Sequence, residues 1–318
     1  MPIIPAVLGR PAAEAAHLRA ARAATLTCPR GAISHAPGAI AHRMPVLGRL
    51  DRPCVTVPAG TALRTLAAVH LHRATLSADD IVEVGGYATT RPARTVLDLA
   101  RERGVPSGVV AADHALREGL VTRDELRAEF DRCANWPGRK SARITLAMAD
   151  PRAESPLESL SRVRIAAAGL PPPIPQALIF DDEDEFIGRA DFYWDEFGVA
   201  GESDGDIKLD LGAAAVLAGR SRHIDLADTG LIVVRWGWSD ALNFGATARP
   251  RAAPRSPSRV TGPPLDLPFA PVTVANEGAQ RRVSDACGCK PGVSRRGAGR
   301  WCAGRPGRGR RTRAREPR

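Results

Sequence analysis

Aromatic residues are scarce in this sequence, with five Trp, two Tyr and seven Phe among 318 residues. A hydrophobic core must therefore consist mainly of Ala, Val, Leu and Ile, for which a hydrophobic content of 44% suffices. No apolar run approaches the roughly 20 residues that cross a bilayer, so no membrane-spanning helix is predicted. Residues 1–9 lack the basic segment and long apolar stretch of a signal peptide.

Cysteines are also few and scattered, which is not the pattern of a disulfide framework in a chain of this length. The tightest pair is separated by one residue, closer than the usual zinc-ligand spacing, and has no second pair. We therefore expect a cytoplasmic protein. The six cysteines are Cys28, Cys54, Cys133, Cys287, Cys289 and Cys302.

The net charge of +10 is concentrated at one end of the chain. Residues 246–318 carry 17 basic and 4 acidic residues, a net charge of +13, whereas residues 1–245 carry −3. This tail also holds ten Pro and nine Gly, a composition that predicts disorder. Its charge would favour loose binding to any polyanion through counterion release.

The first half of the chain shows helical and β patterns in alternation. An Ala-rich segment at 11–25 predicts a helix, and Thr90-Arg-Pro92 predicts the start of another that extends to Arg103. Strands are predicted at 54–57 and 69–72. His70 and His72 share one face of the latter strand, but without a Cys or acid at ligand spacing we interpret them as packing residues. Arg94 and Asp98 form an i, i+4 helix pair worth tenths of a kcal/mol.

The second half begins after Asp150-Pro151 with a different order of elements. Ser155-Pro-Leu-Glu158 matches a capping box with Pro at the first helical position. Three strands follow, then a helix over 213–228 and an apolar run at 231–236 typical of a buried strand. The predicted order α-β-β-β-α-β indicates a mixed sheet with flanking helices.

Acidic residues gather on a predicted hairpin in this half. Glu202 and Asp204 lie two apart on one strand and share a face, and Asp191 lies on the strand before it. Carboxylates that approach one another repel unless a cation lies between them. Mg²⁺ binds one or two carboxylates together with water and phosphate oxygens, the chemistry of metal-assisted phosphodiester hydrolysis.

The same residues resemble a known family. Ser155 to Glu158, Ala190-Asp191-Phe192 and Glu202-Ser-Asp204-Gly205 are similar to motifs of the PD-(D/E)XK restriction-endonuclease-like fold, in the branch related to very short patch repair endonucleases. The resemblance implies that Asp191 and Glu202 bind Mg²⁺ or Mn²⁺ with help from the Ser203 carbonyl. It also implies that Glu158 orients water or a second ion.

One position departs from that family's pattern. The family has Lys two residues after the second acid, where this chain has Asp204. An acid cannot stabilise an anion as an ammonium group does. Lys208, in the following turn, is the candidate replacement.

Residues 30–135 resemble the middle region of actinobacterial proteins that carry an AbiEi-type antitoxin module before such a nuclease-like domain. Those relatives begin with a winged helix–turn–helix, of which residues 1–29 would be a truncated remnant. The resemblance implies DNA and a cognate toxin as partners. The matching stretches are Ile33-Ser-His35, Pro45-Val-Leu-Gly48, Val69-His-Leu-His72 with Arg73, Asp79-Asp80-Ile81-Val82 and Thr90-Arg-Pro-Ala-Arg-Thr-Val-Leu-Asp-Leu-Ala100.

We therefore expect an α/β (α+β) chain with a smaller antitoxin-like domain at 30–149, a restriction-endonuclease-like domain at 150–245 and a disordered tail at 246–318. The leading hypothesis is a Mg²⁺-dependent DNA endonuclease. The alternative is a non-catalytic, DNA-binding antitoxin or transcriptional regulator of a type IV toxin–antitoxin system. A third hypothesis is that the basic tail alone binds nucleic acid without preference.

Overall fold

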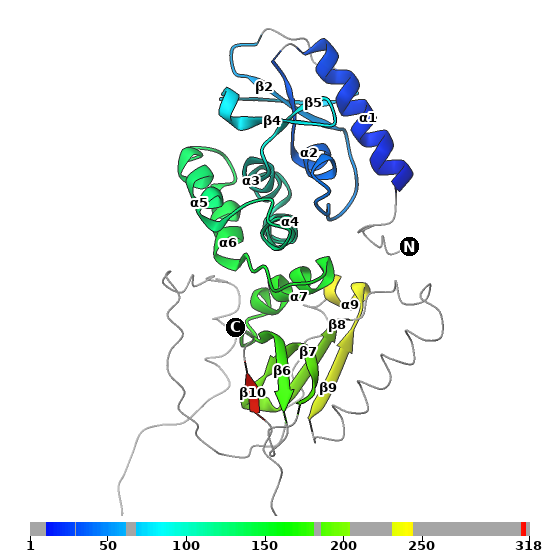
Figure 1. Cartoon of the computed structure of the whole chain (residues 1–318), viewed down its shortest axis with the longest axis vertical. Coiled ribbons are helices and arrows are strands. Elements are labelled where there is room, and N and C mark those ends of the chain that lie inside the picture. Colours follow the sequence, from blue (N-terminus) through cyan, green and yellow to red (C-terminus); the bar gives the residue numbers. More distant parts are fainter. Residues whose placement is uncertain are drawn as a thin grey trace, which may run out of the picture. The chain divides into compact units, whose positions relative to one another are not determined.

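The computed structural model describes residues 11–28, 30–61, 68–180, 186–203 and 231–243, together with the backbone of 313–315. The chain divides into two compact units, Met1–Arg255 with Thr312–Arg318, and Ser256–Arg311, the second of which lies outside the described residues. The first unit contains helices and two five-stranded sheets (Figure 1). This confirms the predicted α+β class. Asp204, Lys208 and the helix expected at 213–228 lie outside the described residues.

The first sheet has the strand order β3-β2-β1-β5-β4. Pairing is parallel between β2 and β3 and between β1 and β5, and antiparallel between β1 and β2 and between β4 and β5. Chain segments distant in sequence therefore meet in this sheet. Its strands are β1 (Ala32–Ile33), β2 (Cys54–Pro58), β3 (His70–Ala74), β4 (Ile81–Val84) and β5 (Tyr87–Thr90).

Helices Pro11–Thr27 and His35–Ala41 pack against this sheet, and a third helix begins at a signal read from the sequence. Pro92 is at the start of α3, where its missing N–H costs no hydrogen bond. Thr122 and Glu125 form the reciprocal cap of α5, with hydrogen bonds of 3.2 and 2.7 Å. The helical segments are α1 (Pro11–Thr27), α2 (His35–Ala41), η1 (Ala78–Asp80), α3 (Pro92–Arg103), α4 (Val105–Arg117), α5 (Arg123–Arg132) and α6 (Arg139–Met148).

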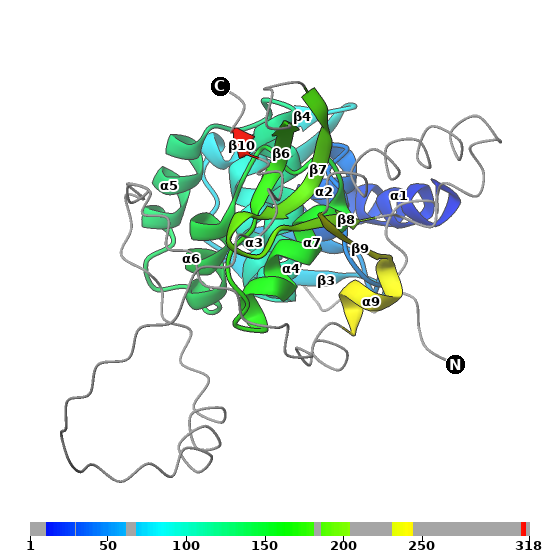
Figure 2. The same ribbon diagram turned by 90° about the horizontal axis from the view of Figure 1, so that it is seen from below.

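The second sheet has the order β10-β6-β7-β8-β9. Strands β6, β7 and β8 form an antiparallel meander, and β9 pairs with β8 in parallel. Figure 2 shows β6 and β7 of this sheet from below, with α7 beside them. The elements are α7 (Pro156–Ala167), β6 (Ile174–Phe180), β7 (Phe186–Trp194), η2 (Asp195–Phe197), β8 (Val199–Ser203), β9 (Ile232–Trp236), α9 (Trp238–Leu242) and β10 (Arg313–Arg315).

Helix α7 packs on this second sheet through a core built around two aromatic residues. The rings of Phe192 and Trp236 stack with centroids 5.3 Å apart, and Leu160 packs in the same cluster. Trp236 also donates its indole N–H to the Ser161 hydroxyl at 2.7 Å. A Cβ at Gly201 would lie 2.6 Å from the Trp236 ring, so this strand position requires glycine. The packing fixes α7 relative to β7 and β8.

Strand β10 comes from the tail that we expected to be disordered. Its three residues pair antiparallel with Leu178, Ile179 and Phe180 of β6. An edge strand presents unpaired backbone groups that accept another strand largely irrespective of sequence, which is why composition alone does not predict this pairing.

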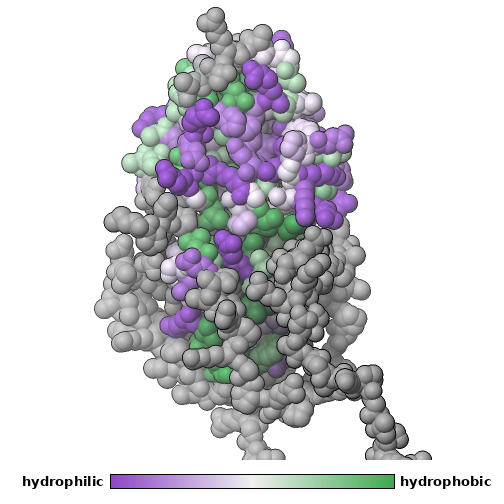
Figure 3. Space-filling model, turned by 180° about the vertical axis from the view of Figure 1, so that it is seen from behind, coloured by the Kyte–Doolittle hydropathy of each residue, from purple (hydrophilic) through white to green (hydrophobic). Residues whose placement is uncertain are grey.

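The surface around the second sheet includes hydrophobic side chains. Ile232 and Val234 of β9 are 59% and 44% exposed among the described residues. Green, hydrophobic surface is visible in the lower half of Figure 3, interrupted by grey atoms. None of the described helices combines the length and apolar character needed to span a bilayer.

Candidate functional site

Asp191 and Glu202 lie near each other on the neighbouring strands β7 and β8. The register of these strands pairs Phe192 with Gly201 and Tyr193 with Ala200, so Asp191 and Glu202 each lie one residue beyond the last pair. The Ser203 N–H and hydroxyl both donate to Asp191 Oδ2, at 2.8 and 2.9 Å. Three of the residues in the predicted site therefore gather at the end of β8.

Glu202 has a basic neighbour on the next strand. It stands opposite Arg235 in the parallel pairing of β8 and β9, and Arg235 Nη2 donates to Glu202 Oε2 at 3.2 Å. Guanidinium groups remain charged at any accessible pH. A permanent positive charge thus lies beside this acid, a feature that the sequence motifs did not reveal.

Glu158 lies on α7 and does more than cap that helix. Its N–H donates to Ser155 Oγ at 3.1 Å, as the sequence predicts for a cap. Its carboxylate is buried and accepts hydrogen bonds from the Glu154 N–H at 2.9 Å and from Gln176 Nε2 at 2.8 Å. Burial, and next the negative charge of Asp191, raise the pKa of Glu158. Two acids therefore interact unfavourably here.

Gln176 lies beside Glu158 and Asp191, at an irregular point of the sheet. The pairing of β6 with β7 includes Pro175–Phe192 and Ala177–Ala190 but passes over Gln176, which stands opposite Asp191. Gln176 has a φ of 54°, a left-handed conformation that is costly for a non-glycine residue. Its Oε1 atom is buried without a hydrogen-bond partner in the described part of the chain. Such an orphaned oxygen suits a cation or a water molecule.

The structure therefore describes four of the six residues of the predicted site. Glu158, Asp191, Glu202 and Ser203 lie on α7, β7 and β8, whereas Asp204 and Lys208 lie outside the described residues. Sequence reasoning missed Gln176 and Arg235, because the sheet register, not a motif, brings them to the acids. In the residues that the structure describes, the ligand-type side chains that converge most tightly lie elsewhere, around the first sheet.

That second group consists of His35, Cys54, His72 and Glu102. One ligand atom of each lies within 4.8 Å of those of the others. His35 begins α2, Cys54 begins β2, His72 lies on β3 and Glu102 lies in the last turn of α3. The imidazoles of His35 and His72 stack with centroids 3.8 Å apart. We interpreted His72 as a packing residue because its partners come from three other elements, which the sequence does not place beside it.

Burial determines the charges in this group. Desolvation lowers the pKa of both His35 and His72 to about 3, so both imidazoles are neutral near pH 7. Desolvation also raises the pKa of the Cys54 thiol to about 12. In the absence of a metal, this sulfur is therefore protonated.

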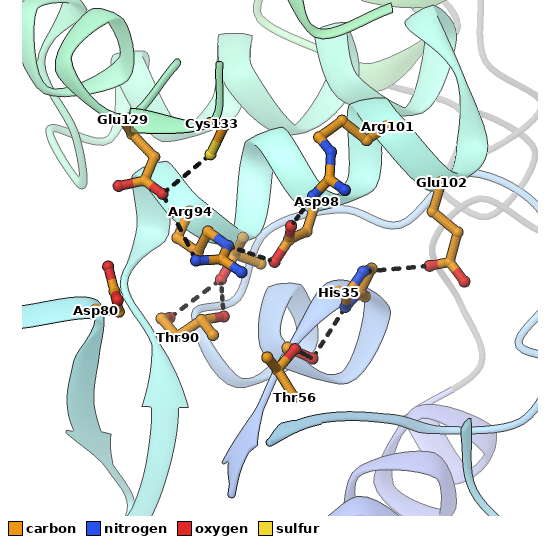
Figure 4. Close-up of polar contacts among 12 residues, drawn as sticks. His35, Thr56, Asp80, Thr90, Arg94, Asp98, Arg101, Glu102, Glu129 and Cys133 are labelled. Atoms are coloured by element: carbon orange, nitrogen blue, oxygen red, sulfur yellow. Dashed lines mark hydrogen bonds and ion pairs between the residues drawn. The ribbon is translucent and has the colours of Figure 1, made fainter. Parts of the chain in front are cut away.

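Hydrogen bonds orient the His35 ring through its Nδ1 atom. Its Nδ1 lies 2.9 Å from Ser34 Oγ, which accepts from the Thr56 hydroxyl at 2.8 Å (Figure 4). Its Nε2 is directed instead toward Glu102, with 3.9 Å between the nitrogen and Oε2. His35 also has a left-handed backbone, with a φ of 55°. Backbone strain of this kind clusters at functional sites.

A buried ionic network lies next to this group (Figure 4). Asp98 accepts from Arg94 Nε at 2.9 Å and from Arg101 Nη1 at 2.8 Å. We expected the Arg94–Asp98 pair to contribute only tenths of a kcal/mol. That value applies to exposed pairs, but Arg94 and Asp98 are 2% and 1% exposed. Breaking such a buried pair leaves an uncompensated charge and costs far more.

Two proteins of Mycobacterium tuberculosis are similar to this chain: uncharacterized protein Rv2248 of strain H37Rv and uncharacterized protein MT2308 of strain CDC 1551 / Oshkosh. Each is 32% identical to it over 151 residues, which are 48% of this chain and 55% of the relative. The chain therefore spans about half the length of the curated relatives it matches. No family model and no solved structure matches the chain.

Proposed function

We propose that residues 150–245 form a Mg²⁺-dependent, nuclease-like unit that hydrolyses phosphodiester bonds of DNA in the cytoplasm. The observation that carries this proposal is the pair of hydrogen bonds from Ser203, the residue after Glu202 at the end of β8, to Asp191 on β7. The order α7-β6-β7-β8, followed by the parallel strand β9, supports it further, because the resemblance implies this arrangement.

The donor atoms at this place fit a hard divalent cation. Asp191 and Glu202 would hold Mg²⁺ together with the backbone carbonyl of Ser203, and Gln176 Oε1 adds a neutral oxygen nearby. A cation would also relieve the repulsion between Asp191 and Glu158 that raises the pKa of Glu158. When bound, the ion supplies Lewis-acid activation of water and of the phosphoryl group.

In this proposal Glu158 acts through its position and Arg235 through its charge. Glu158, anchored by Gln176 and the Glu154 N–H, would orient the attacking water through its carboxylate. Arg235 supplies a positive charge beside Glu202, although the resemblance places a Lys on the same strand as the acid. A guanidinium group stabilises a developing anion but does not transfer a proton. Arg235 would therefore serve as an electrostatic group only.

A second candidate function has its own support. The Glu202–Arg235 ion pair neutralises one of the two acids internally, and Asp204 stands in the position of the family's Lys. Both features favour a non-catalytic protein that keeps the nuclease-like fold and acts as a DNA-binding, AbiEi-like antitoxin or regulator. Its partners would be DNA and a cognate toxin.

Cleavage of plasmid DNA by the full chain tests these two functions. The nuclease proposal expects nicking or linearisation that requires Mg²⁺ or Mn²⁺. It also expects a loss of at least roughly 100-fold in Asp191→Asn and Glu202→Gln, since each removes a ligand of an ion worth several kcal/mol. The control is Glu196→Gln, an exposed acid of η2 in the same meander.

Three results distinguish a nuclease, a DNA-binding regulator and nucleic-acid binding by the tail. Cleavage that is retained in Glu196→Gln but lost in Asp191→Asn and Glu202→Gln supports the nuclease. Specific DNA binding without cleavage at any metal concentration rejects it in favour of the regulator. Binding whose salt dependence disappears when the arginines of 246–318 are replaced by glutamine assigns DNA affinity to the tail.

A further inference from the structure

We propose that His35, Cys54, His72 and Glu102 form a structural Zn²⁺ site in the first sheet, separate from the nuclease-like site. Two imidazole nitrogens, one thiolate and one carboxylate oxygen are the donor types that zinc binds in proteins. Their ligand atoms all lie within 4.8 Å of one another. No described group around the second sheet shares this composition.

The distances agree with a tetrahedral ion. Bonds of about 2.0–2.3 Å to zinc place neighbouring ligand atoms about 3.3–3.8 Å apart. His72 Nε2 lies 3.7 Å from Glu102 Oε1, and His35 Nε2 lies 3.9 Å from Glu102 Oε2. These separations, each to a different Glu102 oxygen, exceed hydrogen-bond length and are close to such a ligand–ligand distance. Because the His35 and His72 rings are stacked, binding one ion also requires these rings to turn so that both Nε2 lone pairs point toward it.

The two histidines present the atoms that a metal requires. His72 Nε2 is buried and makes no hydrogen bond with the described residues. When His35 Nδ1–H donates to Ser34 Oγ, its Nε2 carries the lone pair that points toward Glu102. Metal-bound histidines characteristically donate their other ring nitrogen in this way, which fixes the ring orientation.

The four ligands come from four elements, so the ion would connect them. It would join the start of α2 to β2, β3 and the end of α3. Four protein ligands complete a tetrahedral shell, which is typical of structural rather than catalytic zinc. His70 packs against His72 with ring centroids 4.1 Å apart.

Metal content and cobalt spectroscopy of the full chain test this site. The purified protein should contain about one equivalent of zinc, as expected for a closed four-ligand site. Cobalt substitution should give the visible bands of tetrahedral Co²⁺ and a thiolate charge-transfer band. Cys54→Ser and His72→Gln should lose both the zinc and the bands.

Matched variants separate this site from other cysteines and histidines. Cys133→Ser removes a thiol of the same domain that is equally buried and whose pKa is likewise raised to about 12. His42→Gln removes a half-buried histidine bound to the Thr90 carbonyl. The double variant Cys287→Ser, Cys289→Ser removes the close pair in the tail. All three should keep one equivalent of zinc and the cobalt spectrum.

A milder variant covers the case in which Cys54→Ser does not fold. Thr56→Val keeps its side-chain shape but removes the hydroxyl that supports Ser34 and His35. It should weaken zinc binding roughly 10–100-fold in competition with a chelator. Folded wild-type protein that binds neither metal would overturn the proposal. Zinc affinity unchanged in both Thr56→Val and His72→Gln would do the same.

Discussion

The buried acids around the two sheets differ in the side chains that lie beside them. Around the first sheet, buried acids lie beside arginines: Asp98 contacts Arg94 and Arg101, and Asp80 contacts Arg132. Around the second sheet, the buried Glu158 has an amide as its side-chain partner and a second acid, Asp191, nearby. An acid paired with an arginine already has a counter-charge within the protein, whereas an acid beside another acid is stabilised by a bound cation.

This difference separates structural acids from candidate functional acids. The conspicuous carboxylates of the first sheet are satisfied within the protein, so their burial does not indicate a magnesium site. Around the second sheet, Glu158 instead lies beside a like charge, Asp191, and Gln176 Oε1 adds an orphaned buried oxygen.

The largest effect is expected from Asp98→Ala. It removes the carboxylate that accepts from Arg94 Nε and leaves this buried guanidinium with only the more distant Glu129, 3.8 Å away, so the free energy of unfolding should fall by about 3–5 kcal/mol. The matched control is Asp131→Ala, which breaks the exposed i, i+4 pair with Arg127 and should cost less than about 1 kcal/mol. Urea unfolding measures both variants. Equal losses would show that the buried network is not structural.

A smaller effect is expected from Asp80→Asn. Burial alone would raise the pKa of Asp80, but hydrogen bonds from Ser77 and the contact with Arg132 outweigh it and lower the pKa below 3.8. The ionised form is thus favoured in the folded state, and the variant should lose about 1–3 kcal/mol at pH 7. The exposed neighbour Asp79→Asn is the control.

The sign of the pH dependence follows from this lowered pKa. The contribution of Asp80 is fully present above pH 3.8 and is lost as the pH falls through the folded-state value. Unfolding measured at pH 7 and at progressively lower pH should show the wild type converging with Asp80→Asn. A difference that stays constant down to the acid transition would contradict this assignment.

The smallest effect is expected from Glu158→Gln without metal. Burial and Asp191 raise the pKa of Glu158, so its charged form destabilises the folded state. This loss is absent below pH 4.5 and develops as the pH rises through the folded-state pKa. The variant should therefore gain stability relative to the wild type between pH 4.5 and 7, as measured by thermal unfolding. The opposite trend would indicate that Glu158 has a cationic partner.

Local elements were predictable because their signals lie within a few residues. The cap at Ser155, Pro92 at the start of α3 and the apolar run of β9 each identify an element without tertiary information. Strand β5 was not predicted, because Tyr87–Thr90 carries little apolar alternation and is stabilised by pairing with β1 and β4. Propensity does not encode such pairing.

The candidate sites were predictable to different degrees. Asp191 and Glu202 lie on consecutive strands, so a hairpin argument places them together. His35 and His72 are far apart in sequence and meet only through the parallel pairing of β2 with β3 and the packing of α2. The role of Gln176 depends on a backbone conformation that no sequence pattern indicates.

Mg²⁺-dependent thermal unfolding of the full chain tests the central claim most directly, because magnesium prefers oxygen ligands over the His and Cys donors of the first sheet. At 100 times its dissociation constant, Mg²⁺ should stabilise the wild type and Glu196→Gln by about 2.7 kcal/mol. Asp191→Asn should show no such gain. Stabilisation of Asp191→Asn equal to that of the wild type, or none in either protein, would contradict a magnesium site between β7 and β8.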